Sequence, residues 1–112
     1  MEHDLEKVRA RLLELREELL RIGESAEEGR RPVELDQSRV GRLSRMDALQ
    51  VQAMAVEADR RRAVELKRID AALARIEAGE YGYCANCDEE IAAKRLEFDP
   101  AVPTCIDCAR GA

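Results

Sequence analysis

All four cysteines of this 112-residue chain lie near its C-terminal end, and their spacing limits how that end can fold. They form two Cys-x2-Cys pairs, Cys84 with Cys87 and Cys105 with Cys108, and 17 residues separate the pairs. Two residues between thiols allow a tight turn to direct both sulfur atoms at one point, and two such pairs complete a tetrahedron. The pattern therefore predicts one structural Zn²⁺ per chain, held by these four thiolates.

Other interpretations of the four thiols stay open from the spacing alone: a redox-sensing pair, an iron site of the same geometry, or a metal that is released on oxidation. The sequence shows no secretory signal and no membrane-spanning apolar run, so we expect a cytoplasmic protein without a membrane partner. In a reducing compartment, thiols are more often metal ligands than disulfides. A closed four-sulfur site has no open position for water, and no nucleophile–histidine set is recognisable, so we expect no enzyme.

Upstream of the cysteines, two long segments carry apolar residues at heptad spacing, which predicts two helices. We expect the first helix to end near Gly23, with this seam: Leu5, Val8, Leu12, Leu15, Leu19 and Ile22. We expect the second to start at a capping box, Ser44–Asp47, or earlier at Asp36 or Ser38, and to end at Gly79. Its apolar stripe comprises Leu49, Ala53, Val56, Ala63, Leu66, Ile69, Leu73 and Ile76. Charged residues make up 38% of the chain, which suits solvated helices.

Two heptad helices joined by one loop predict a mainly α fold, an antiparallel two-helix coiled-coil hairpin followed by a small C-terminal four-cysteine zinc-finger module. We place the hairpin at residues 1–78, with its tip at about residues 24–44. The four-cysteine zinc finger then comprises residues 79–112 and packs at the base of the second helix.

The expected pairing of the two helices follows from folding the chain about the loop centre near Pro32. Leu5 then lies beside Val56 or Ala58, and the stripe from Leu66 to Ile76 has no partner on the first helix. We expect four apolar residues of the finger to cover that stripe: Ile91, Leu96, Phe98 and Val102. Self-association of two chains through the same stripe is the alternative. At the tip, Leu43 and Met46 are expected to face inward.

The residues around the cysteines carry more information than their spacing. The segment "GEYGYCANCDEEIAAKRLEFDPAVPTCIDC" resembles the zinc-finger region of the DksA/TraR family. The matching residues are Gly79, Tyr81, Gly82, Tyr83, Cys84, Cys87, Ile91, Arg95, Leu96, Pro100, Cys105, Ile106, Asp107 and Cys108. The preceding hairpin agrees with the family in architecture, with a looser side-chain match.

The resemblance implies a non-enzymatic transcription regulator that binds bacterial RNA polymerase directly, without DNA contact. In that family the coiled coil enters the secondary channel of the polymerase, and some members act together with ppGpp, which is therefore a candidate ligand. The formal net charge of −5 is consistent with the absence of DNA binding. The segment from residue 84 onward, with three basic and six acidic side chains, is acidic as well.

The sequence departs from the family at the tip, where members that act on initiation carry an acidic motif at the start of the second helix. Here the partner-binding candidates are Asp36, Arg42, Arg45 and Asp47. Arginines could pair with polymerase carboxylates or with phosphates, or they could simply keep a loop soluble. The helix that usually follows the last cysteine pair is expected to be absent or a stub, because the chain ends at Ala112.

Two other functions fit the same residues. A zinc-stapled coiled coil could act as a protein-interaction or dimerisation module, with the Leu66–Ile76 stripe as its interface. Alternatively, oxidation of the thiols could eject zinc and loosen the helix base, which would make the chain a redox sensor.

Overall fold

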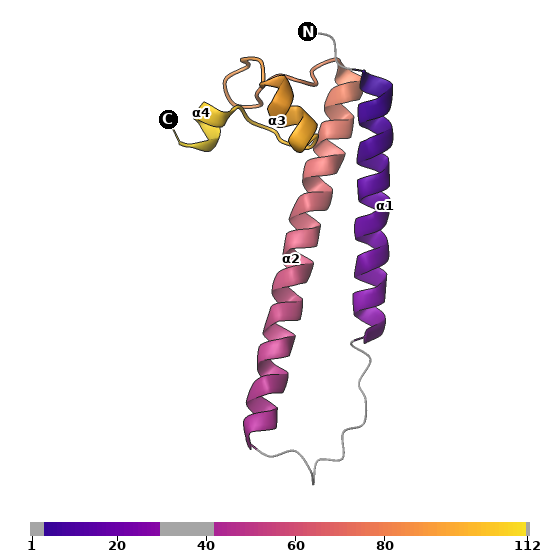
Figure 1. The fold of residues 1–112 in the computed structure, drawn as a ribbon, viewed down its shortest axis with the longest axis vertical. Helices are drawn as coiled ribbons and strands as arrows, with labels where there is room; N and C mark the ends of the chain where they lie inside the picture. Colours follow the sequence, from indigo (N-terminus) through magenta and orange to yellow (C-terminus); the bar gives the residue numbers. More distant parts are fainter. Residues whose placement is uncertain (1–3, 30–41, 112) are drawn as a thin grey trace.

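The computed structural model describes residues 4–29 and 42–111, which form two long helices and two short ones (Figure 1). The helices are α1 (Leu5–Gly29), α2 (Arg42–Ala78), α3 (Ala93–Phe98) and α4 (Ile106–Ala109). The long helices α1 and α2 run antiparallel, and the segment with α3 and α4 lies against the C-terminal part of α2. The predicted mainly helical hairpin with a C-terminal cysteine module is confirmed. None of the helices in the described part of the chain combines the length and apolar character that a bilayer crossing requires.

The pairing of α1 with α2 differs from the prediction. Arg9, in the second turn of α1, forms an ion pair with Glu77 in the last turn of α2. One heptad further along α1, Arg16 Nε lies 2.9 Å from an Asp70 carboxylate oxygen. Leu5 therefore cannot lie beside Val56, because the start of α1 is at the end of α2. The prediction was wrong because the loop does not fix the register of two heptad stripes.

The core lies where α1, α2 and the cysteine module meet. Ile69 of α2 is 0% exposed and packs in one cluster with Leu12 of α1. The expectation that Ile69 and its stripe neighbours lack a partner on the first helix was wrong. The other buried members of the cluster are Ala72, Tyr81, Cys84, Ile91, Leu96, Ala101 and Val102. The cluster is flanked by partly buried apolar residues of the two long helices, namely Val8, Leu15, Leu19, Leu73 and Ile76.

Three of the four finger residues expected at the helix base are buried in this cluster, namely Ile91, Leu96 and Val102. Phe98 is the exception, because its side chain is 88% exposed. Leu96 and Phe98 both belong to α3, and residues two apart on a helix point in nearly opposite directions. Since Leu96 faces the core, Phe98 faces solvent.

The C-terminal end of α1 and the N-terminal start of α2 also differ from the prediction. The helix α1 continues through Gly23 to Gly29. One glycine inside a helix costs roughly 1 kcal/mol relative to alanine. Good helix formers after Gly23, such as Glu24 and Ala26, outweigh that cost. The helix α2 begins at Arg42, so Ser44 lies inside the first turn rather than at the cap. The alternative starts at Asp36 or Ser38 lie outside the described residues.

The first turns of α2 extend beyond the end of α1, as Figure 1 shows. Its apolar side chains Met46, Leu49, Val51, Met54 and Val56 are between 62% and 66% exposed. The expectation that Met46 faces inward was wrong, and the side chain of Leu43 lies outside the described part. Hence the part of α2 expected to pair with α1 is exposed, and the part expected to be covered by the finger alone packs against α1 as well.

The predicted end of α2 at Gly79 is confirmed. Gly79 has φ = 73°, a left-handed conformation that glycine adopts without steric cost. The Glu80 N–H donates to the Arg75 carbonyl at 2.8 Å, and the Gly79 N–H donates to the Ile76 carbonyl at 3.2 Å. These two bonds form a Schellman motif, which satisfies carbonyls at the helix end and turns the chain towards the cysteines.

We predict that Gly79→Ala lowers the free energy of unfolding by about 1–2 kcal/mol, since an added Cβ disfavours the left-handed conformation. No atom outside Gly79 and its two chain neighbours lies within 4 Å of the position that this Cβ would occupy, so the loss reflects backbone conformation alone. Urea denaturation of the zinc-loaded protein measures it. Gly111→Ala is a matched control, because Gly111 also has positive φ (79°) and open space but lies at the end of the chain. Equal stabilities of wild type and Gly79→Ala would contradict the prediction.

Candidate metal centre

The first cysteine pair lies in a tight turn between α2 and α3. An isolated antiparallel bridge joins Tyr83 to Glu90, and the Cys84 N–H donates to the Glu89 carbonyl at 2.7 Å. The chain can reverse between these residues because Asp88 has φ = 63°, which aspartate tolerates better than most residues. The turn directs the thiols of Cys84 and Cys87 to the same side.

The second pair is positioned by α4. Cys105 is the N-cap residue of this short helix, with extended backbone angles, and its carbonyl accepts the Ala109 N–H at 3.0 Å. Cys108 lies inside the helix, three residues after Cys105, so the two side chains lie on the same face of α4. The 17-residue spacer is not a simple loop, because it contains α3, but this helix ends at Phe98, before Pro100 and Pro103.

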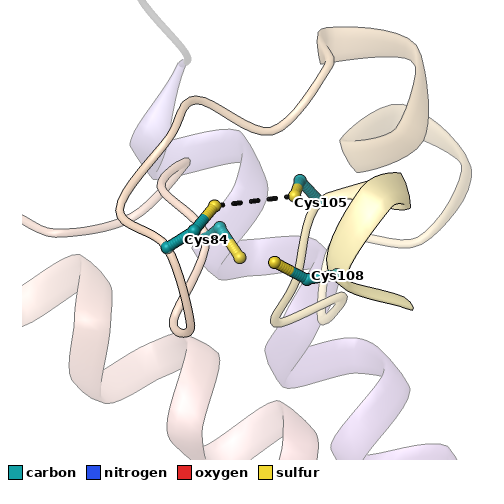
Figure 2. A group of neighbouring side chains, drawn as sticks. Cys84, Cys105 and Cys108 are labelled. Atoms are coloured by element: carbon teal, nitrogen blue, oxygen red, sulfur yellow. Dashed lines mark hydrogen bonds between the residues drawn. The ribbon is translucent and has the colours of Figure 1, made fainter. Parts of the chain in front are cut away.

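The four sulfur atoms lie within 4.8 Å of one another. Figure 2 shows the side chains of Cys84, Cys105 and Cys108 converging on one point. A tetrahedron with Zn–S bonds of ~2.3 Å has edges of about 3.8 Å. The Cys87 and Cys105 sulfurs are 3.7 Å apart, and all four cysteines are free thiols. The residues present therefore fit one tetrahedral metal ion with no position left for a substrate.

The electrostatics of the cluster favour a bound cation. Burial would raise the pKa of Cys84, but backbone N–H groups directed at its sulfur lower that pKa to about 6. A backbone hydrogen bond from Glu89 would lower the pKa of Cys87, but desolvation and the neighbouring thiols raise it to about 12. Neighbouring thiols resist ionising together because their negative charges repel. A divalent cation relieves that repulsion and stabilises the thiolates.

Asn86 donates hydrogen bonds to sulfur atoms of both cysteine pairs. Its backbone N–H lies 3.4 Å from the Cys84 sulfur, as the CxxC turn predicts. Its side-chain amide lies 3.4 Å from the sulfur of Cys108 in the other pair. This second contact could not be predicted from the sequence, because it depends on how the two cysteine pairs face each other.

Several arginines fasten the cysteine module, a role that the sequence did not reveal. Arg68 of α2 pairs with the Asp99 carboxylate at 2.5 Å, and Arg11 of α1 donates to the Glu97 carbonyl at 2.6 Å. Arg75 and Arg95 donate to carbonyls near the cysteines. An arginine in a charged helix is usually solvated. Its hydrogen bonds to the cysteine module become apparent only when the position of that module in the folded structure is known.

The partner-binding candidates are remote from the cysteines. Arg45 and Asp47 are exposed near the start of α2, at the opposite end of this helix from the metal centre. Arg42 is the first residue of α2, and its side chain lies outside the described part. Asp36 lies outside the described residues altogether. The tip role of all four residues stays a prediction.

Comparisons with known proteins agree with the metal centre. The prokaryotic dksA/traR C4-type zinc finger family matches residues 79–112. The RNA polymerase-binding transcription factor DksA of Haemophilus influenzae is 44% identical over 43 residues, which are 38% of this chain and 30% of that protein. DksA of Escherichia coli strain K12 is 42% identical over 43 residues, 38% of this chain and 28% of that protein. The chain thus matches less than a third of the length of these curated relatives.

A solved structure extends the similarity to the hairpin. Transcription factor DksA2 from Pseudomonas aeruginosa superposes with a TM-score of 0.66 and 30% sequence identity. The match covers 96% of this chain and 81% of that protein. The likeness therefore includes both long helices as well as the C4 zinc finger.

Proposed function

Because this chain belongs to the DksA/TraR family of C4-type zinc-finger proteins, we propose that it is a cytoplasmic, non-enzymatic transcription regulator that binds bacterial RNA polymerase directly. In this proposal Cys84, Cys87, Cys105 and Cys108 hold one structural Zn²⁺. The hairpin of residues 1–78 supplies the contact that acts on transcription, and the finger of residues 79–112 supports it. The binding of ppGpp and the absence of DNA contact stay predictions.

In the proposal, the hairpin inserts into the secondary channel of the polymerase. The observation that supports it is the match of nearly the whole chain, hairpin included, to DksA2. One uninterrupted helix, α2, connects the finger to the tip region over 37 residues, or about 55 Å. A continuous helix transmits position along its length, so the finger, held by Arg68 to Asp99, would set how deep the tip inserts. The exposed first turns of α2 would then contact the polymerase.

The proposal is tested with purified zinc-loaded protein and core RNA polymerase. Wild type should bind the polymerase in a pull-down and alter transcription in a purified system. The double variant Arg45→Ala/Asp47→Ala should retain polymerase binding but lose about tenfold of its effect on transcription, which corresponds to ~1.4 kcal/mol of lost contact. Both side chains are exposed, so we expect the fold to be unchanged.

Asp4→Ala/Lys7→Ala is a matched control, because it removes an exposed pair of opposite charges at the other end of the hairpin. It should leave binding and transcription unchanged. The absence of any association between wild type and polymerase would overturn the proposed function. Equal effects of the two double variants would overturn the assignment of the tip to α2.

A second candidate function, a protein-interaction or dimerisation module, is favoured by the exposed apolar residues Met46, Leu49, Met54 and Val56. The interface first expected for it, the Leu66–Ile76 stripe, is occupied by α1 and the finger. Sedimentation of dilute protein distinguishes the two candidates. A tight dimer that does not associate with polymerase would favour the interaction module.

A further inference from the structure

One side chain of α2 reaches the segments that lead into both cysteine pairs. Arg75 is half-buried in the last turn of α2. Its guanidinium donates one hydrogen bond to the Tyr83 carbonyl and another, at 3.4 Å, to the Pro103 carbonyl. Tyr83 directly precedes Cys84, and Pro103 lies two residues before Cys105. A single planar group thus connects the helix with the entries to both halves of the metal centre.

The same place also holds a direct link between the two cysteine segments. The Ala85 N–H donates to the Pro103 carbonyl at 2.8 Å, so this carbonyl accepts from the first cysteine turn and from Arg75 together. Arg95 donates to the Thr104 carbonyl at 3.0 Å, but it belongs to the finger itself. Arg75 therefore differs from Arg95, because it joins both cysteine segments to the long helix.

We infer that Arg75 is a positioning residue for the zinc site. It holds the two cysteine pairs at the separation that a tetrahedral ion requires, and it couples the site to α2. The five N–H donors of a guanidinium have a fixed planar arrangement, so one arginine can bond two carbonyls in a defined geometry. Holding the ligands in place before the ion binds reduces the ordering that binding requires, which tightens binding. This inference does not depend on binding to polymerase.

The test uses the full-length zinc-loaded chain and measures zinc affinity and the rate of zinc transfer to a chromophoric chelator. Residues that orient metal ligands typically change metal affinity by roughly 10–100-fold when they are replaced, and we expect a loss in this range for Arg75→Ala. Arg75→Lys should lose nearly as much, because an ammonium keeps the charge but cannot bond both carbonyls with the same geometry.

Two other arginines that join segments of the fold serve as controls. Arg68→Ala removes a tie between α2 and Asp99 of the finger that does not reach the cysteine segments. Arg16→Ala removes the ion pair with Asp70 inside the hairpin. Both variants should hold zinc within about twofold of wild type, since neither side chain hydrogen-bonds to the segments that lead into the cysteine pairs.

A second readout separates positioning from general stabilisation. Thermal melts are recorded for wild type and Arg75→Ala with zinc bound and after chelation. If Arg75 couples the site to α2, the shift in melting temperature caused by zinc will be smaller in Arg75→Ala than in wild type. A contribution to stability alone would lower both melts equally and leave that shift unchanged.

Three results would overturn the inference: zinc affinity of Arg75→Ala within twofold of wild type, an equal loss in Arg68→Ala, or an unchanged zinc-dependent shift in melting. If Arg75→Ala does not fold even with excess zinc, Arg75→Lys and Arg75→Gln are judged by the same three criteria. The assay contains no polymerase, so its outcome and that of the proposed function are read independently.

Discussion

Replacing Cys84 with serine is expected to abolish stoichiometric zinc binding and to unfold residues 79–111. The Cys84 side chain is 1% exposed and belongs to the core cluster as well as to the sulfur cluster. A structural zinc ion in a small module typically contributes ~10–16 kcal/mol of apparent binding energy, which is as large as the whole stability of an ordinary domain. The apolar residues of the finger cannot offset that loss. The hairpin should melt at a lower temperature, because the finger forms part of its core.

Elemental analysis measures the zinc content, and amide hydrogen exchange measures protection of the finger. Protection of the Cys84 and Ile91 N–H groups, which bond to backbone carbonyls, should disappear in the variant. Ala85→Ser is a matched control, since it adds a hydroxyl at the neighbouring exposed position and should retain zinc. Chelation of the wild type should reproduce the Cys84→Ser result. An unchanged melt after chelation would show that the metal does not hold this fold together.

The second large effect is expected from Ile69→Ala, which should lower the free energy of unfolding by about 2–5 kcal/mol. Ile69 is 0% exposed at the junction of α1, α2 and the finger, where its loss leaves a cavity that the rigid helices cannot close. Urea denaturation of the zinc-loaded protein measures the change. Zinc content should be retained, since Ile69 is not a ligand candidate.

Val64→Ala is the control for Ile69→Ala, because it truncates an apolar side chain of the same helix that is about half exposed. It should cost less than about 1 kcal/mol. A loss below about 1 kcal/mol for Ile69→Ala, or equal losses in the two variants, would mean that the junction is not the main core of the molecule.

The features that could be predicted from the sequence are those that depend on near neighbours in the chain. The Cys84–Cys87 and Cys105–Cys108 spacings set the turns that gather the thiols. Asp88 and Gly79 tolerate the left-handed conformations that the two turns need. The heptad apolar residues predict two long helices, because a side chain's position on a helix follows from its number alone. The confirmed parts of the fold and of the metal cluster follow from such rules.

The pairing of the helices could not be predicted in this way. A heptad seam looks the same after a shift of seven residues, so it does not choose one register. The choice follows from contacts that exist only in the folded molecule, among them the ion pairs of Arg9 with Glu77 and of Arg16 with Asp70. The error in register also reversed which half of α2 was expected to pack against α1.

The local elements of the chain follow from its residues alone: two heptad helices, a helix end at Gly79, and four thiols spaced for one tetrahedral ion. Three other features become apparent only in the folded molecule: the register of α1 on α2, the exposure of Phe98 and the attachment of the finger through Arg75. Helix periodicity, turn conformation and ligand spacing depend only on residues close together in the chain, so they do not change with the tertiary fold. The other features depend on the core that α1, α2 and the finger bury together. The free energy of that burial arises only when all three are packed against one another.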